Sequence, residues 1–232
     1  MSVDFAATSS TSRLRIWDAP VRLFHWALVL LIGAAWWTAE QRMLDLHRLA
    51  GYSILTLVLF RIVWGFVGSD TARFSSFLRG PLDVARYVGS HMFRRGAPPA
   101  APGHNPLGGW SVVAMLALLI TQVLLGFISV DVDGIESGPF AHLVEFDTGR
   151  AAAELHEFVF NVLLGVIGLH VAAVLFYLLF RRDNLIRPMF TGSRPWVGKG
   201  PALRFATLRR AVIVFAVCAV LIWLLLAYVS AV

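Results

Sequence analysis

The chain has 232 residues, of which 58% are hydrophobic and only 15% are charged. A soluble domain carries about 25% charged residues, and disordered chains are poorer in apolar residues, so both classes are excluded. The formal net charge of +6 would suit a nucleic-acid-binding protein, but the positive charges are divided by membrane side and form no single patch. The one cysteine, Cys218, excludes a disulfide framework and cysteine-based zinc or haem attachment. The composition therefore indicates a membrane protein.

Five apolar stretches are long enough to cross a bilayer, because a hydrocarbon core of about 30 Å needs roughly 20 helical residues. Their approximate bounds are 21–39, 49–68, 107–130, 156–180 and 211–232. We expect an all-α membrane protein in which residues 21–192 form a four-helix transmembrane bundle. A polar tail (1–20) precedes the bundle, and a linker with a fifth helix (193–232) follows it. The tail lacks the apolar core of a cleaved signal peptide.

Positive charge is concentrated on one side of these spans. Sixteen Lys and Arg residues lie in the N-terminal segment and in the connections 69–106 and 181–210. The opposite side holds only Arg42, Arg48 and Arg150, together with nine acidic residues. Because cytoplasmic connections collect Lys and Arg, we expect the N-terminus inside and the C-terminus outside.

Four of the seven histidines occur at matching depths. His47 and His156 each lie two residues before an apolar run that begins on the outer side. His25 and His170 lie fifteen and thirteen residues inward of the acidic residues at that boundary, and these depths agree within about one helical turn. His156 and His170 are fourteen residues apart, so they project from one helix face, about 21 Å apart along its axis. The histidines thus form one pair near each membrane half.

Two histidines that face each other across a helix bundle suit the two axial positions of a haem iron. When protein occupies both positions, electron transfer is favoured over oxygen binding. The spacing therefore predicts an inner haem held by His25 and His170 and an outer haem held by His47 and His156. No residue is expected to be catalytic.

Candidate contacts surround these histidines. Gly51 lies one helical turn beyond the histidine of the second span, where it would leave room for a flat macrocycle. Arg22 and Arg61 on the inner side and Arg48 on the outer side are candidates for haem-propionate contacts. His104, at the inner mouth of the third span, is a candidate for a propionate or quinone contact. Helix packing, snorkelling and a helix-entry loop explain the same residues without a cofactor.

The histidines leave other functions open. They could bind a transition metal or relay protons in a transporter or channel, although the apolar runs, the fourth of which starts at Phe158, contain no Asp or Glu. A structural anchor for a partner complex, without any cofactor, is a third alternative. A His-Glu-x-x-His protease motif beginning at His156 would need a histidine at Phe160, so that motif is excluded.

Four segments resemble the bacterial di-haem cytochrome b561 family, which includes the b-type cytochrome subunits of nickel-iron hydrogenases. They are VRLFHWALVLL around His25, LHRLAGYSILTLVLFRIVWG around His47 and Arg61, GHNPLGGW before the third span, and HEFVFNVLLGVIGLHVAAVLFYLLFRRDNLIRPM around His156 and His170. The resemblance covers roughly residues 16–192. It implies a four-helix bundle with two b haems, held by the same two histidine pairs.

The resemblance also implies a role. Members of the family carry electrons between the membrane quinone pool and a redox partner, often a periplasmic c-type cytochrome or oxidoreductase subunit, and one branch oxidises superoxide and reduces quinone. We therefore expect a bacterial inner-membrane protein that contacts lipid and quinone and binds no nucleic acid; whether it is itself an enzyme, and whether it forms a homodimer, are left open. The fifth span, the Pro-rich inner connection (96–103) and the acidic outer loop (131–154) depart from the simplest members.

Overall fold

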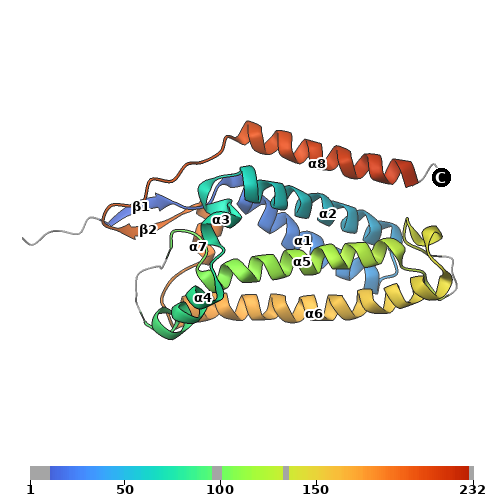
Figure 1. Ribbon diagram of the computed structural model, residues 1–232, viewed down its shortest axis with the longest axis horizontal. Coiled ribbons are helices and arrows are strands. Elements are labelled where there is room, and N and C mark those ends of the chain that lie inside the picture. Colours follow the sequence, from blue (N-terminus) through green and yellow to red (C-terminus); the bar gives the residue numbers. More distant parts are fainter. Residues whose placement is uncertain (1–10, 96–100, 133–135, 230–232) are drawn as a thin grey trace, which may run out of the picture.

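Five long helices dominate the computed structural model, which describes residues 11–95, 101–132 and 136–229 (Figure 1). Each helix is long and apolar enough to span a membrane. They are α1 (Ala19–Glu40), α2 (Leu44–Val67), α5 (Pro106–Ile128), α6 (Phe146–Leu179) and α8 (Leu208–Val229). The expectation of an all-helical, multi-pass membrane protein is confirmed.

The bundle consists of α1, α2, α5 and α6, and α8 lies along its outside (Figure 1). In the described chain α1 packs on α2, α2 on α5, and α5 on α6, while α1 and α6 make no comparable contact. Helix α2 is the most enclosed, because 44% of its most apolar stretch is buried against 6% to 22% in the other four helices. The ring of helices is therefore closed by packing on three sides and left looser between α1 and α6.

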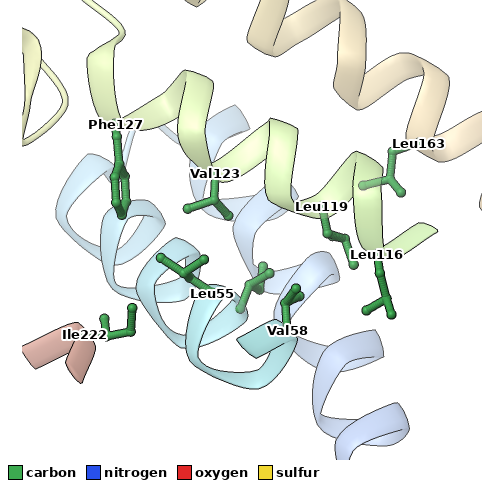
Figure 2. Close-up of a cluster of buried hydrophobic side chains, with 9 residues drawn as sticks. Leu55, Val58, Leu116, Leu119, Val123, Phe127, Leu163 and Ile222 are labelled. Carbon is green, nitrogen blue, oxygen red and sulfur yellow. The ribbon is translucent and has the colours of Figure 1, made fainter. Parts of the chain in front are cut away.

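The main apolar core lies between α2 and α5 (Figure 2). Helix α2 contributes Leu55 and Val58, and α5 contributes Leu119 and Val123. Lipid tails are as apolar as these side chains, so the helices are held together here by close van der Waals packing. Leu163 of α6 and Ile222 of α8 complete the same cluster. This core fixes the positions of the helices that carry the histidines.

The two ends of the bundle differ in charge and in secondary structure. We call the basic end the one that carries the arginine-rich connections and most of the short elements (Figure 1). These elements are β1 (Thr11–Arg15), a 3-10 turn (Asp70–Ala72), α3 (Phe74–Phe77), α4 (Pro81–Tyr87), a π-helical segment (Val88–Met92), α7 (Ile186–Thr191) and β2 (Ser193–Val197). The opposite, acidic end carries the α1–α2 turn and the α5–α6 connection with its 3-10 turn (Ala141–Leu143).

Two helix starts at the basic end follow from capping residues. Asp18 accepts a hydrogen bond from Val21 N at 2.8 Å and begins α1, and Asn105 accepts one from Gly108 N at 2.7 Å and begins α5. A proline follows within the first turn of each helix, where its missing N–H costs nothing. The α5 cap directly follows His104, so it fixes that histidine beside the bundle.

The structure differs from the expected boundaries at three places. Helix α6 begins at Phe146, ten residues before the expected 156, because a polar but helix-favouring segment precedes its apolar part. β1 pairs antiparallel with β2, so parts of the expected tail and linker form a small sheet. Of the Pro-rich stretch 96–103, residues 96–100 lie outside the described part, as do 1–10 of the tail, 133–135 of the acidic loop and 230–232.

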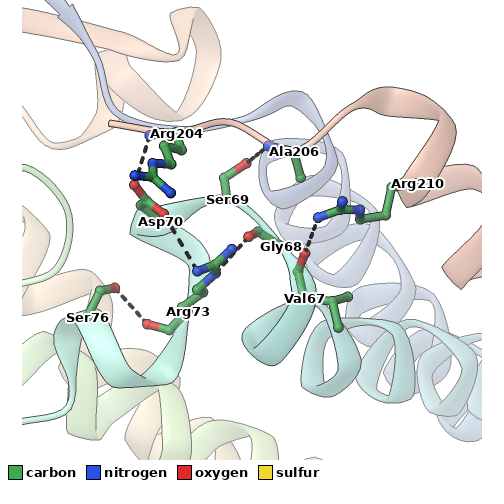
Figure 3. Close-up of polar contacts among 9 residues, drawn as sticks. All are labelled: Val67, Gly68, Ser69, Asp70, Arg73, Ser76, Arg204, Ala206 and Arg210. Atoms are coloured by element: carbon green, nitrogen blue, oxygen red, sulfur yellow. Dashed lines mark hydrogen bonds and ion pairs between the residues drawn. The ribbon is translucent and has the colours of Figure 1, made fainter. Parts of the chain in front are cut away.

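Polar contacts at the basic end attach the start of α8 to the bundle (Figure 3). The backbone N–H of Arg204 donates to Asp70 Oδ2 at 2.8 Å, and that of Ala206 donates to Ser69 Oγ at 3.1 Å. Arg210 Nη1 donates to the carbonyl of Val67 at 3.2 Å. The fifth helix, which begins at Leu208 rather than 211, is therefore fixed against the end of α2.

Candidate functional site

The histidine pair at the acidic end is preassembled. His47 of α2 and His156 of α6 have ring centres 6.0 Å apart and ring planes at 74°. Nδ1 of His47 is 2.8 Å from the carbonyl oxygen of Ala35, and Nδ1 of His156 is 2.8 Å from that of Gln122. A carbonyl can only accept, so each Nδ1 carries the proton and each Nε2 keeps its lone pair. This is the tautomer in which histidine binds a metal.

The spacing of these two rings matches a shared metal ion. A metal–imidazole bond is about 2 Å long, and the ring centre lies about 1.1 Å behind the nitrogen, so two in-line ligands place their ring centres about 6 Å apart. The separation in the structure is 6.0 Å. Within the described residues no group of three or more His, Cys, Asp and Glu side chains is arranged to hold a metal. The pair His47 and His156 therefore fits the two axial ligands of an iron porphyrin.

Two glycines give this pair room on one side and close contact on the other. A Cβ built on Gly51, one turn after His47, would meet no atom within 4 Å. A Cβ on Gly126 of α5 would lie 3.0 Å from Cε1 of His156, which is tighter than side chains normally approach. Gly126 thus lets α5 pack against the imidazole, while the open space at Gly51 is what a flat macrocycle needs.

The pair at the basic end is held by fewer direct contacts than the pair at the acidic end. His25 of α1 and His170 of α6 are near enough to interact electrostatically, but within the described chain their rings share no direct contact of the kind that joins His47 and His156. The His25 ring meets Trp26 edge-on at 4.9 Å. Its buried Nδ1 has no hydrogen-bond partner among the described residues.

His104 lies beside this basic-end pair. Its ring is held between Trp17, at 4.7 Å, and Phe77, at 4.8 Å, and its buried Nδ1 has no partner in the described chain. Burial, followed by the nearby groups of Arg61, His170 and His25, lowers the pKa of His104 to about 3. The imidazole is therefore neutral at physiological pH and can donate one hydrogen bond.

Arg61 is the second unsatisfied group at the basic end. The residue is only 2% exposed, and its Nη1 is buried without a partner in the described residues. Its guanidinium lies over Phe74 and Phe77, with ring centres at 5.3 and 5.9 Å. Buried donors are almost always paired, and a buried unpaired charge is costly. Two orphaned donors, Arg61 and His104, therefore fit an acidic group, such as a haem propionate, beside His25 and His170.

The other predicted arginines already have protein partners. Arg22 Nη1 donates to the carbonyl of Phe190, although its buried Nε is unpaired in the described chain. Arg48 forms ion pairs with Asp45 at 2.7 Å and Glu136 at 3.4 Å. Contact of Arg22 or Arg48 with a propionate stays a prediction.

Sequence reasoning missed the groups that orient the histidines and enclose the basic end. The carbonyls of Ala35 and Gln122 are backbone acceptors, which any residue offers, so no sequence signal marks them. Asp18 is 1% exposed, accepts from Trp64 Nε1 at 3.0 Å and supplies negative charge near Arg61. Its place directly before the first helix was the one available signal.

Comparison with known proteins identifies the family of the chain. A family model described as prokaryotic cytochrome b561 matches residues 16–192. The probable Ni/Fe-hydrogenase 1 B-type cytochrome subunits of Escherichia coli strain K12 and of Escherichia coli O157:H7 are each 26% identical over 214 residues, which covers 77% of this chain and 89% of theirs. No solved structure matches the chain. Since the matched region holds α1, α2, α5 and α6 with all four paired histidines, the chain belongs to the prokaryotic cytochrome b561 family and is a b-type cytochrome that acts in electron transfer.

Proposed function

We propose that this cytochrome holds two b haems, one in each histidine pair, and carries electrons across a bacterial inner membrane between the quinone pool and a periplasmic redox partner such as a c-type cytochrome. The observation that carries the proposal is the facing pair His47 and His156, with ring centres 6.0 Å apart and both Nδ1 atoms on backbone carbonyls. A haem with two imidazole ligands supplies one-electron transfer and leaves no axial position for oxygen.

Each residue of the site has a separate task. His47 and His156 would ligate the iron at the acidic end, and His25 and His170 would ligate the iron at the basic end. The carbonyls that accept from His47 and His156 hold the rings in place and raise their basicity as ligands. Arg61 and His104 would donate to the acidic side chains of the basic-end haem, where their buried nitrogens have no partner among the described residues. The surrounding apolar helices exclude water.

The charge of the two ends supports an orientation and a docking face. By the positive-inside rule, the arginine-rich connections favour a cytoplasmic basic end, and the acidic end would then face the periplasm. Exposed acidic residues gather there around the start of α6, among them Glu145, Asp147 and Glu154. Such a surface attracts a positively charged partner and speeds its association. A cationic periplasmic cytochrome fits this face.

Haem stoichiometry tests the proposal. The purified protein should show reduced-minus-oxidised bands of b-type haem and about two haems per chain. His47→Ala and His156→Ala should each lower this to about one, because either loss leaves the acidic-end iron with a single protein ligand. The exposed His91 and His142 offer matched controls, since His91→Ala and His142→Ala should retain both haems. One haem in the unaltered protein, or zinc or copper without porphyrin, would overturn the proposal.

A further inference from the structure

A cavity of about 430 Å³ lies at the basic end, outside the histidine site. It is lined by Arg79, Asp83, Arg86, Tyr87, Ser90, His91 and Pro106. These residues come from α4, the π-helical segment after it and the first residue of α5. Figure 1 shows α4 beside the start of α5 and the end of α6, which is where both helices leave the apolar layer.

Three tertiary hydrogen-bond contacts hold the walls of this cavity. Tyr87, which is 6% exposed, shares a hydroxyl–hydroxyl bond of 2.5 Å with Tyr177 of α6. Trp110 Nε1 of α5 donates to the carbonyl of Arg79 at 2.9 Å. Arg181 Nη1, just after α6, donates to the carbonyl of His91 at 2.5 Å. These contacts hold the connection that lines the cavity against α5 and α6.

The lining suits a phosphate group with one negative charge. The lining holds two arginines, Arg79 and Arg86, and one aspartate, Asp83, which gives these three residues a formal net charge of +1. The guanidinium of Arg79 also donates to the carbonyl of Ser76 at 3.1 Å. Asp83 pairs with Arg86 at 2.9 Å, but the Arg86 side chain is 73% exposed, and such an ion pair contributes little. A phosphodiester can therefore replace water around both arginines and leave Asp83 in place. Guanidinium forks are well matched to phosphate oxygens.

The surroundings favour a lipid over a soluble phosphate compound. Leu82 and Phe93, on the same segment, are 77% and 62% exposed, and Trp110 is 47% exposed. Phe93 also packs on Phe176 of α6, with ring centres 6.0 Å apart. Exposed apolar and indole side chains beside basic residues are typical of the membrane–water boundary. Basic pockets between spans on the cytoplasmic side bind anionic headgroups.

We infer that the cavity under α4 is a binding site for the phosphodiester headgroup of an anionic phospholipid, with Arg79 and Arg86 as the ligands and Leu82 and Phe93 beside its acyl chains. Such a lipid would bridge α4 to α5 and α6 and hold the basic-end connection against the bundle. This inference does not depend on the electron-transfer partner.

Native mass spectrometry of the haem-loaded protein, titrated with phosphatidylglycerol and phosphatidylcholine, tests the site. Phosphatidylglycerol should bind in preference, and Arg79→Gln with Arg86→Gln should weaken its binding about thirtyfold. The matched control is Arg94→Gln with Arg95→Gln, which removes the same charge from the same connection but from outside the cavity lining. It should change binding less than threefold. Equal losses in both double variants would show a diffuse charge effect and overturn the assignment.

Two further experiments test the role of Asp83 and distinguish a lipid from a soluble phosphate compound. Asp83→Asn should tighten phosphatidylglycerol binding several-fold, since it removes the one carboxylate among the described lining residues, and no change or a weakening would contradict the site. Glycerol 1-phosphate, added at the same concentration as the lipid, should not displace it. Displacement would mean that the cavity binds a soluble phosphate compound, and the lipid assignment would fail. An unchanged haem spectrum in every variant would show that the bundle is intact.

Discussion

The two histidine pairs are built in different ways. At the acidic end, backbone carbonyls fix both imidazoles and place the ring centres 6.0 Å apart. At the basic end, His25 Nδ1 has no partner in the described chain, and the nearby donors of Arg61 and His104 are also unsatisfied. The first pair is therefore organised by the protein alone. The second is arranged so that a bound anionic group would complete its hydrogen bonds.

This difference separates two ways of holding a cofactor. A ligand whose ring is already oriented loses little freedom on binding, so its affinity comes from preorganisation. A pocket with orphaned buried donors gains affinity because the ligand removes an existing penalty. The acidic-end pair should consequently hold its haem more tightly. The haem affinity of the basic-end pair should depend on the charged groups around it.

The largest expected effect concerns haem retention. A His25→Ala variant keeps the preoriented acidic-end pair, and a His47→Ala variant keeps the basic-end pair. Hydrogen bonds to the ligating histidines are worth about 10–100-fold in metal affinity. The His47→Ala variant should therefore lose its remaining haem to excess apomyoglobin at least tenfold faster than the His25→Ala variant does. Spectra of the two proteins recorded over time measure this. Faster loss from the His25→Ala variant would reverse the comparison.

The next effect sharpens the role of Arg61. Arg61→Met removes a buried positive charge and keeps the side-chain volume nearly unchanged. Positive charge stabilises the reduced haem, so the midpoint potential of the basic-end haem should fall by about 65–130 mV, the equivalent of one charge-assisted hydrogen bond. Arg48→Met is the matched control, because Arg48 is already paired with Asp45 at the acidic end. Spectropotentiometry that shows equal shifts in both variants would contradict the assignment.

The spans and the histidine spacing could be predicted from the sequence because lipid imposes a length on each helix and the helical repeat places residues fourteen apart on one face. Apolar length does not mark helix ends, however, so the start of α6 at Phe146 was missed. The β1–β2 sheet was missed because its two short strands are distant in sequence. The pairing of His25 with His170 stays a prediction, since their rings make no direct contact in the described chain.

A smaller effect is expected at the acidic surface. Glu145→Gln with Asp147→Asn should slow association with a cationic c-type cytochrome about threefold to tenfold at low salt, because both charges lie near the start of α6 and would steer the partner. The effect should disappear at high ionic strength. Asp83→Asn at the basic end is the control and should leave the association rate unchanged. Stopped-flow oxidation of the reduced protein measures the rate. An equal effect of both changes would contradict the assignment of the docking face to the acidic end.

The smallest effect is a pH dependence at the basic end. The pKa of His104 is lowered from 6.5 to about 3, mainly by burial. The unfolded chain therefore takes up a proton at His104 below about pH 6.5 while the folded chain does not, so stability should fall as pH drops from 6.5 towards 3 and should be independent of this group above 6.5. His104→Phe, a ring of similar shape between Trp17 and Phe77, should flatten the fall in thermal midpoint over that range. The exposed His142 provides the comparison at the acidic end, because His142→Phe should leave the slope as it was. A slope that His104→Phe does not change would show that the imidazole is not enclosed at the basic end.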